Sequence, residues 1–214
     1  MKKSANLRQE KRHRLLQYDR RFLDQGFSSL AGVDEAGRGP LAGPVVASAV
    51  IVRDFSFESA IDDSKKMTPA SRQVAYEEIL KKCDVASDRV EPEVIDRLNI
   101  LKASLLAMGK AVRKLKTTPD CLLIDGPHAP QASMKRFTIV DGDALSFTIA
   151  CASIVAKVTR DRLMDEYDKV YPQYGFSRHK GYGTREHLEA LKIHGPSPIH
   201  RKSFGPVKRL WKLY

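Results

Sequence analysis

Two runs of small and β-branched residues early in the chain predict neighbouring strands. They cover residues 29–34 (SLAGVD) and 44–52 (PVVASAVIV). The second run is apolar at nearly every position, which is typical of a strand buried on both faces of a sheet. We therefore expect a central sheet that is covered by helices on both sides.

Helical spacing of apolar residues predicts the first two helices. Residues 1–26 form a strongly basic segment that ends at Gly26. Its modest apolar face consists of Leu15, Leu16, Phe22 and Leu23. The next helix begins after a loop, with Thr68 as the N-cap and Pro69 as the first helical residue.

The clearest helical pattern covers residues 93–116, where apolar residues follow one another in steps of four and three. The stripe consists of Val94, Leu98, Leu101, Leu105, Met108, Val112 and Leu115. Coiled coils have the same spacing. Because the stripe ends within this segment, we favour one helix that packs against the core of a globular domain.

The remaining segments complete an alternation of strands and helices. Further strands are predicted over residues 83–90, 121–125 and 136–143. A helix over residues 153–171 is stopped by Pro172, and the tail that follows has one short helix near residues 184–193. This order predicts an α/β domain with a mixed sheet.

Composition narrows the class of protein. With 214 residues, 42% of them hydrophobic, the chain is long enough for one globular domain with a small appendage. Cys83, Cys121 and Cys151 lie in apolar stretches without paired spacing, so we expect buried, reduced thiols. The basic start has no apolar run behind it, and the longest apolar run is too short to span a bilayer. We expect a soluble cytoplasmic protein.

The charge of the chain indicates what it binds. The formal net charge is +11, which favours an acidic partner, with nucleic acid as the leading candidate. A basic surface that only keeps the protein soluble is an equally compatible alternative from charge alone.

Carboxylates follow three of the predicted strands. They are Asp34 with Glu35, Asp125, and either Asp141 or Asp143. Ligands of α/β sheets bind in the crevice outside the strand ends, so neighbouring strands would bring these acids together. Such a cluster requires divalent cations or raised pKa values, and oxygen ligands favour Mg²⁺ or Mn²⁺. The alternative is that these acids only form turns after the strands. That explanation is adequate for one strand, but it is a poor explanation for acids at the ends of three strands.

Basic and aromatic residues accompany these acids in loops. Arg38 projects from the glycine-rich loop after Glu35, whose spacing matches neither a dinucleotide fingerprint nor a P-loop. Arginine binds phosphate through a bidentate fork. The segment DSKK precedes a helix, and Tyr182 lies in the basic loop SRHKGYGT, where it could stack on a base or pack as a core aromatic. Acids that hold metals beside such contacts are typical of a two-metal phosphodiesterase.

Several of these segments together resemble one known family. They are GVDEAGRGPLAGPVVASAVIV, DSKKM, LIDG, GDALSFTIACASIVAKVTRD, HKGYGT and HRKSFGPV. Their order and spacing are similar to those of bacterial ribonuclease HII, the type 2 ribonuclease H. The resemblance implies a ribonuclease H-like α/β fold, with a mixed central β-sheet flanked by helices and a small helical C-terminal extension. The related ribonuclease HIII family differs in the first motif and carries an added N-terminal domain.

The same resemblance implies an activity. It is metal-dependent endonucleolytic hydrolysis of the RNA strand of RNA–DNA hybrids, and nicking 5′ of single ribonucleotides embedded in duplex DNA. Cleavage would leave a 3′-hydroxyl and a 5′-phosphate, in ribonucleotide removal and RNA primer processing. Two Mn²⁺ or Mg²⁺ ions per site are expected.

Site residues follow from the matched motifs. The resemblance assigns metal binding and catalysis to Asp34, Glu35, Asp125 and Asp143, and so prefers Asp143 to Asp141. Residues expected to bind the substrate are Gly37, Arg38, Gly39, Lys65, Lys66, Lys157 and Tyr182. The three-residue loop would read the ribonucleotide 2′-hydroxyl, and Tyr182 would sense the junction with deoxyribonucleotide. The lysines would contact phosphate or support the site.

The expected organisation has three parts. Residues 1–28 form a basic helix, residues 29–171 the catalytic domain, and residues 172–214 a C-terminal extension that binds substrate and packs on the same domain. We expect a monomer, with a possible replication-factor contact through the tail FGPVKRLWKLY, which could instead only pack as a helix.

Two alternatives belong to other functional classes. A catalytically silent hybrid-binding protein is disfavoured, because a pure binder would gain from losing carboxylates that repel phosphate. A carboxylate-pair glycosidase leaves Arg38 and the basic loops without a role.

Overall fold

A computed structural model of the chain describes residues 2–211, with side chains from residue 9 onward. Residue 1 of the predicted basic helix and residues 212–214 of the predicted extension lie outside this part. The helices are α1 (Lys2–Leu23), α2 (Pro69–Lys82), α3 (Pro92–Leu98), α4 (Ile100–Arg113), α5 (Gly142–Leu145), α6 (Phe147–Val170), η1 (Pro172–Tyr174), α7 (Phe176–His179), α8 (Arg185–His194) and α9 (Gly205–Trp211). The strands are β1 (Leu30–Ala36), β2 (Val45–Val52), β3 (Cys83–Val90), β4 (Cys121–Asp125) and β5 (Lys135–Ile139).

The five strands form one mixed sheet in the order β3-β2-β1-β4-β5. β2 pairs antiparallel with both of its neighbours, β1 and β3. β1, β4 and β5 run parallel to one another, so their C-terminal ends lie at the same edge of the sheet. The predicted mixed α/β sheet is confirmed.

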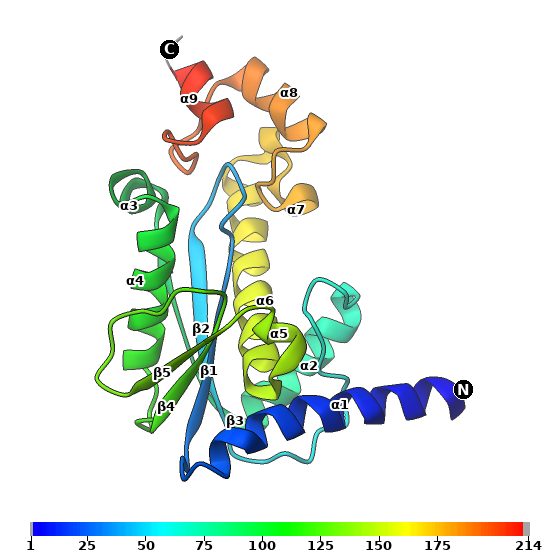
Figure 1. Ribbon diagram of the computed structural model, residues 1–214. Coiled ribbons are helices and arrows are strands. Elements are labelled where there is room, and N and C mark those ends of the chain that lie inside the picture. The colour runs from blue at the N-terminus through cyan, green and yellow to red at the C-terminus, as the bar shows by residue number, and fades with distance from the viewer. Residues whose placement is uncertain (1, 212–214) are drawn as a thin grey trace.

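Helices cover both faces of this sheet (Figure 1). α4 packs on one face, where Ala107 and Met108 meet Val33 and Ile124. α6 and α2 pack on the other face. Each residue of β2 is buried, which confirms the prediction of a strand covered on both sides.

β1 and α6 approach each other unusually closely. A Cβ atom on Gly32 would lie 2.2 Å from the carbonyl carbon of Thr148, so only glycine fits at this position of β1. The start of α6 is capped from α1, because the Asp19 carboxylate accepts hydrogen bonds from the amide and the hydroxyl of Thr148, both at 2.9 Å. The N-terminal helix α1 thereby fixes the start of α6 beside β1.

The predicted single helix over residues 93–116 is wrong in one respect. The chain forms two helices, α3 and α4, that meet at Asn99 with φ 71° and ψ 165°. Asn99 ends α3, and its side chain accepts a hydrogen bond from the amide of Lys102, which begins α4. Asparagine is a strong N-cap, and the backbone angles of Asn99 lie in a region that residues other than glycine rarely adopt. The break is therefore a local backbone feature that apolar spacing does not reveal.

Two other predicted boundaries also change. The strand predicted over residues 136–143 ends at Ile139, and the following residues turn into the short helix α5. The helix predicted from residue 153 begins at Phe147, because the Ser146 side chain accepts a hydrogen bond from the amide of Ile149. Asp143 therefore lies on a helix rather than at a strand end.

The predicted basic helix and the predicted helices after Thr68 and near residues 184–193 are confirmed as α1, α2 and α8. Leu15 and Phe22 of α1 are buried, whereas Leu23 is exposed. The free thiols of Cys121 and Cys151 are buried as expected, but Cys83 is only half-buried. None of the described helices combines the length and apolarity that a membrane span requires.

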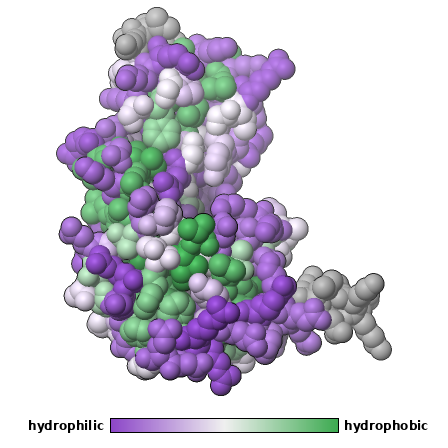
Figure 2. All heavy atoms as spheres, in the orientation of Figure 1, coloured by the Kyte–Doolittle hydropathy of each residue, from purple (hydrophilic) through white to green (hydrophobic). Residues whose placement is uncertain are grey.

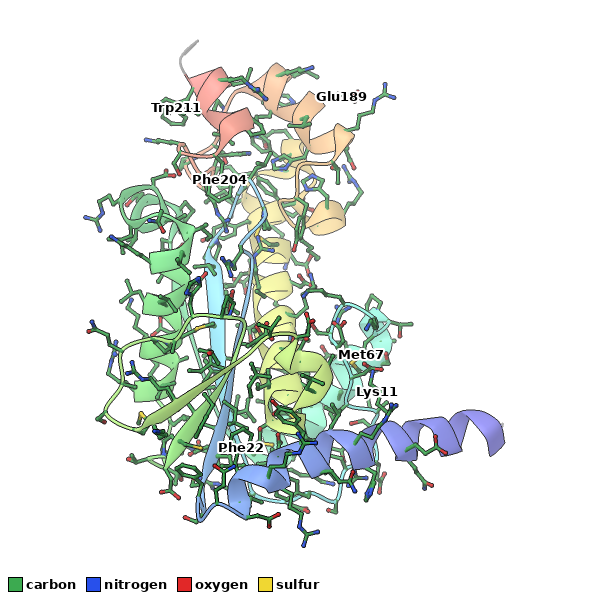
Figure 3. All side chains as sticks on the ribbon, in the orientation of Figure 1. Lys11, Phe22, Met67, Glu189, Phe204 and Trp211 are labelled. Carbon is green, nitrogen blue, oxygen red and sulfur yellow. The ribbon has the colours of Figure 1, made fainter. Side chains whose placement is uncertain are left out.

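Residues 172–211 form a helical cap beyond one end of the sheet (Figure 1). This C-terminal extension has its own cluster of buried side chains, which also includes Leu41 and Ala42 from the loop between β1 and β2. Phe204 packs against both this cluster and the core under the sheet, and Figure 3 shows it where the two regions meet. Hydrophilic side chains predominate along the described part of α1 and at the edges of the extension (Figure 2).

Candidate active site

The strand register brings the first acids together. Val33 of β1 pairs with Ile124 of β4, so the next residues, Asp34 and Asp125, lie side by side where the parallel strands end. Asp125 pairs in turn with Ile139 at the end of β5. A strand end therefore positions each of these carboxylates at the edge where α/β sheets bind ligands.

Asp34 is the most deeply buried acid of the group. Its side chain is only 5% exposed, and its Oδ1 accepts a hydrogen bond from the amide of Glu35 at 2.6 Å. Burial raises the pKa of Asp34 well above its usual range, and the charges of Glu35 and Asp125 raise it further. A hydrogen bond from the Ser153 hydroxyl acts in the opposite direction. The geometry therefore disfavours negative charge here unless a cation is present.

Glu35 and Asp143 are perturbed in the same direction. Burial raises the pKa of Glu35, although Arg38 lowers it, and burial with the charge of Asp125 raises the pKa of Asp143. Asp143 is buried on α5, and its Oδ2 lies 4.0 Å from the Nζ of Lys65. Asp141, the alternative that strand spacing left open, is exposed and precedes α5 with a left-handed backbone.

The side chains that could hold a metal ion at this site are all carboxylates. Among residues 2–211, no group of three or more His, Cys, Asp or Glu side chains is close enough together to hold a metal ion as it stands. The donors nevertheless are oxygen only. Burial raises the pKa values of Asp34 and Asp143, and the charge of Asp125 raises both further, so a divalent cation would favour their charged forms. The carboxylates thus fit a hard ion such as Mg²⁺ or Mn²⁺, which would have to draw them together.

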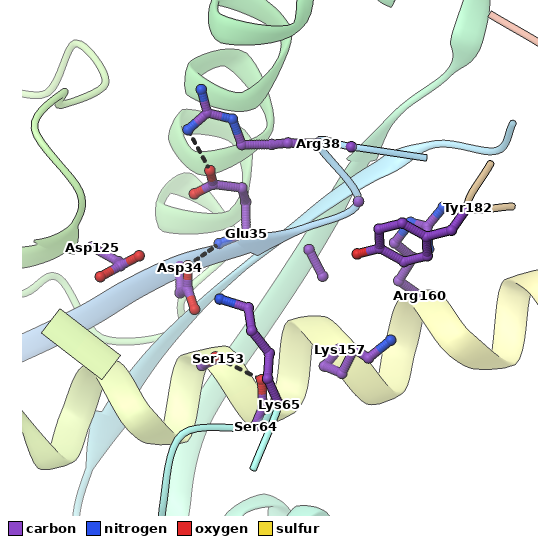
Figure 4. A pocket seen from close by; sticks show the side chains of 13 residues that line it. Asp34, Glu35, Arg38, Ser64, Lys65, Asp125, Ser153, Lys157, Arg160 and Tyr182 are labelled. Carbon is purple, nitrogen blue, oxygen red and sulfur yellow. Dashed lines mark hydrogen bonds and ion pairs between the residues drawn. The ribbon is translucent and has the colours of Figure 1, made fainter. Parts of the chain in front are cut away.

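A cavity of about 270 Å³ opens beside these acids. Figure 4 shows Asp34, Glu35 and Asp125 on one side and Lys65, Lys157 and Tyr182 facing the same space. The predicted site residues that line it are Asp34, Glu35, Gly37, Arg38, Gly39, Lys65, Asp125, Lys157 and Tyr182. Asp143 and Lys66 do not line it; Asp143 adjoins it through Lys65.

The loop from residue 37 to residue 44 leaves β1 at the rim of this cavity. Arg38 folds back so that its Nη1 lies 3.2 Å from the Oε1 of Glu35 (Figure 4). Gly37 has φ 100°, and a Cβ there would lie 2.1 Å from the Nε of Arg160. Both the backbone angle and the close contact require glycine at this position.

Tyr182 forms the opposite rim from within the C-terminal extension. Its ring is 46% exposed, and a Cβ on Gly39 would lie 3.5 Å from that ring. The backbone is held firmly, because the Tyr182 amide donates to the His179 carbonyl at 2.9 Å and the Tyr182 carbonyl accepts from the Thr184 amide at 2.8 Å. An exposed ring on a fixed backbone is suited to stacking on a sugar or base.

The three predicted lysines differ in their surroundings. Burial lowers the pKa of Lys65, but Asp143, Asp34 and further acids raise it more, so the net shift is upward and Lys65 stays charged. Lys157 pairs with Asp161 at 2.7 Å. Lys66 pairs with Asp63 at 3.4 Å, points into solvent, and lies away from the cavity.

Four lining residues, Ala36, Ser64, Ser153 and Arg160, were not identified from the sequence as members of the site. Ser64 and Ser153 lie within 3.0 Å of each other through their hydroxyls, beside Asp34. Arg160 of α6 lies beneath Tyr182 in Figure 4. Each belongs to a segment that the resemblance quoted, but nothing in the residue types alone separates them from their neighbours.

Comparison with known proteins identifies the family. A family model described as ribonuclease HII matches residues 31–207. A ribonuclease HII from Syntrophobacter fumaroxidans is 54% identical over 195 residues, covering 91% of this chain and 84% of the relative. A ribonuclease HII from Endomicrobium trichonymphae is 52% identical, covering 90% of this chain and 93% of the relative.

Solved structures agree with this result. The ribonuclease H2 from Pyrococcus horikoshii OT3 has a TM-score of 0.74 at 24% identity, over 87% of this chain and 98% of that chain, which shows the shared fold. The ribonuclease HII in a PCNA complex from Archaeoglobus fulgidus has a TM-score of 0.72 at 26% identity, over 83% and 96%. Together with the sequence matches, these likenesses show that the chain belongs to the ribonuclease HII family and is an endoribonuclease of the ribonuclease H type.

Proposed function

We propose that this protein hydrolyses the RNA strand of RNA–DNA hybrids and nicks duplex DNA 5′ of a single embedded ribonucleotide. Cleavage leaves a 3′-hydroxyl and a 5′-phosphate. The observation that carries the proposal is one cavity that joins the carboxylates of Asp34, Glu35 and Asp125 to the loop of Gly37, Arg38 and Gly39. Chemistry on a phosphate and inspection of a sugar can then occur at adjacent positions.

The acids would hold two Mg²⁺ or Mn²⁺ ions, with Asp34, Glu35 and Asp125 contributing from strand ends and Asp143 from α5. A ribonuclease HIII structure with 16% identity to this chain is a complex with Mn²⁺. Such ions, when bound, supply Lewis acidity at the phosphate and counter-charge for the leaving oxygen.

The chain's own basic and aromatic residues would orient the substrate. Arg38 can exchange Glu35 for a phosphate, because its Nη1–Oε1 contact of 3.2 Å is long and its side chain is half-exposed. Lys65 and Lys157 face the same cavity and would neutralise neighbouring phosphates. The Tyr182 ring would stack on the sugar at the junction, opposite Gly39.

The test uses an end-labelled DNA duplex with one ribonucleotide, incubated with Mg²⁺, with Mn²⁺ and with excess chelator. We expect a single cut 5′ of the ribonucleotide that chelator abolishes. An all-DNA duplex of the same sequence is the control and should remain intact.

Other outcomes separate the parts of the proposal. If the protein cleaves a long RNA–DNA hybrid but not the duplex with a single ribonucleotide, the catalytic assignment of the acids stands. The junction-sensing roles of Arg38 and Tyr182 are then wrong. Tight binding without any cleavage would favour the silent hybrid-binding protein.

The extension is proposed to complete the substrate surface through Tyr182. A contact with a replication factor through the tail is a further part of the proposal, supported by the archaeal relative's complex with PCNA. The final residues of that tail, 212–214, lie outside the described part of the chain.

A further inference from the structure

We propose that Arg201, assisted by Arg160, is a positioning residue that holds the 37–44 loop with its carbonyls inward and the amides of Arg38 and Gly39 outward, toward the substrate. The inference rests on the proposed function, because it assigns the part that sets how this loop presents itself to the ribonucleotide. Neither arginine touches the reacting atoms in this assignment.

Arg201 binds the loop with its whole guanidinium group. Its Nη2 donates to the Gly37 carbonyl at 2.6 Å and its Nη1 to the Arg38 carbonyl at 3.0 Å. Its Nε and Nη2 both donate to the Gly43 carbonyl, at 3.0 and 2.9 Å. One side chain from the C-terminal extension therefore joins both ends of the loop.

Arg160 completes this contact from α6. Its Nε donates to the Pro44 carbonyl at 3.1 Å and its Nη2 to the Ala42 carbonyl at 3.2 Å. Its Nη1 donates to the Lys180 carbonyl at 3.0 Å, which ties the loop to the segment before Tyr182. Substrate-facing residues on both rims of the cavity thus depend on the same pair of arginines.

The geometry of the peptide group turns these contacts into an orientation. In a trans peptide the carbonyl and the following amide point in opposite directions. Because the carbonyls of Gly37 and Arg38 point at Arg201, the amides of Arg38 and Gly39 point away from it. Among residues 2–211, neither amide has a hydrogen-bond acceptor. Two free donors at the cavity rim are suited to a hydroxyl or phosphate oxygen.

The environment of the arginines argues against a purely structural role. Arg201 is 0% exposed and Arg160 is 1% exposed, and within the described residues neither has a carboxylate within salt-bridge distance. Burial, with the charge of Arg160, lowers the pKa of Arg201 to about 9. Two buried cations beside each other are costly, and a core could be filled more stably by apolar residues. The two arginines offset this cost by fixing the orientation of the carbonyl groups in the 37–44 loop.

The first measurement is amide hydrogen exchange over the loop in Arg201→Lys, with Lys202→Ala as the matched control. Lysine keeps the charge but has no planar fork that can reach three carbonyls. The Lys202 side chain lies over the Trp211 ring, 4.1 Å from its centroid, and not against the loop. The amides of Leu41 and Gly43 are the probes, because they donate to the Gly181 and Ile199 carbonyls at 2.8 and 2.9 Å.

We expect faster exchange at these amides in Arg201→Lys and wild-type exchange in Lys202→Ala. In the same variants, kcat/KM on the duplex with one ribonucleotide should fall about ten- to a hundredfold in Arg201→Lys only. Affinity for the all-DNA duplex, which has no 2′-hydroxyl to read, should not change. Added guanidinium at low concentration should restore part of the activity of Arg201→Ala.

Two results would overturn the inference, and a third would overturn only the proposed function. Unchanged exchange in Arg201→Lys would show that the loop is held by other contacts. If Arg201→Lys loses all-DNA binding and cleavage to the same extent and also has a lower melting temperature, Arg201 has only a structural role. If the wild-type protein cuts neither substrate, the proposed function fails, and hydrogen exchange alone decides whether Arg201 positions the loop.

Discussion

The body of the molecule and its C-terminal extension are stabilised by different kinds of core. Under the sheet the buried side chains are almost all aliphatic, from Val33 and Ile124 on the strands to Met108 on α4. In the extension the rings of His179 and His187 stack with centroids 4.5 Å apart, and the Nε2 atoms of His187 and His200 lie 3.0 Å apart. The first core depends on apolar burial alone, whereas the extension adds directional polar contacts to its apolar cluster.

This difference matches the two tasks of the site. Apolar burial is strong but has no preferred direction, and it suits strands that only have to bring acids to one edge. Hydrogen-bonded networks fix orientation and respond to protonation. Tyr182, which would stack at the junction, is held by the second kind, since the Nδ1 of His187 lies 2.9 Å from the Tyr182 carbonyl. Variants that affect one region and spare the other can therefore test the comparison.

The largest expected effect is in the acidic region. Asp34→Asn should reduce cleavage of the single-ribonucleotide duplex by about 10³-fold or more, on the order of 4 kcal/mol of transition-state stabilisation. Hybrid binding should persist or improve, because a carboxylate that repels phosphate is gone. The melting temperature in chelator should not fall, since the buried charge beside Glu35 and Asp125 is removed. Full activity in this variant would contradict the metal assignment.

A matched pair sharpens the assignment of the fourth acid. Asp143→Asn should lower kcat by about a hundredfold or more, because Asp143 is buried next to Lys65 and is affected by the charge of Asp125. Asp141→Asn should leave kcat unchanged, because Asp141 is exposed and asparagine tolerates its φ of 54°. Single-turnover cleavage of both variants is the measurement. The reverse order of effects would exchange their roles.

Acidification should weaken the extension before it weakens the body. Burial lowers the pKa of His187 to about 4 and that of His200 to about 3, against about 6.5 in an unfolded chain. Both residues bind protons more readily when unfolded. Their contribution is therefore complete above about pH 6.5 and declines as pH falls toward 4, by on the order of 2 kcal/mol for each at pH 5. Asp19 in the body has the opposite sign, because burial raises its pKa to about 6.

Trp211, the single tryptophan of the chain, lies in α9 of the extension and reports this difference. The unfolding midpoint from its fluorescence should fall between pH 7 and pH 5 more than the midpoint from far-ultraviolet circular dichroism. The exposed His194→Asn variant should behave as wild type. Parallel shifts of both midpoints would mean that the extension and the body unfold as one unit.

The smallest effect separates two adjacent lysines. Lys65→Ala should raise KM about fivefold, on the order of 1 kcal/mol, because Lys65 faces the cavity and the acids. Lys66→Ala should change KM less than about twofold, because Lys66 points into solvent and pairs with Asp63. Initial rates across a range of substrate concentrations decide between them. Equal effects would place both lysines on the phosphate backbone.

The sequence predicted the mixed sheet from short-range signals, and it predicted most of the residues that line the cavity from such signals together with the family resemblance. Apolar runs locate β1 and β4, and acids next to glycine locate the strand ends. The break at Asn99 was missed because apolar spacing continues across it and only a backbone angle interrupts the helix.

The two buried arginines were missed for another reason. Arg201 contacts carbonyls that lie more than 150 residues earlier in the chain, at Gly37, Arg38 and Gly43. Backbone carbonyls are the same for every residue type, so the sequence around residues 37–44 carries no mark of the partner. In composition, Arg160 and Arg201 look like any other part of the basic surface.

The length of α6 sets a spacing that no loop can adjust. Ser153 lies beside Asp34, and Arg160 holds the loop that would inspect the sugar. Seven residues of helix separate them by about 10 Å, nearly two full turns. One residue added between them would shift the second group by 1.5 Å and rotate it by about 100°. An insertion between these two positions is therefore expected to separate the acids from the loop, whereas insertions in surface loops should leave this spacing intact.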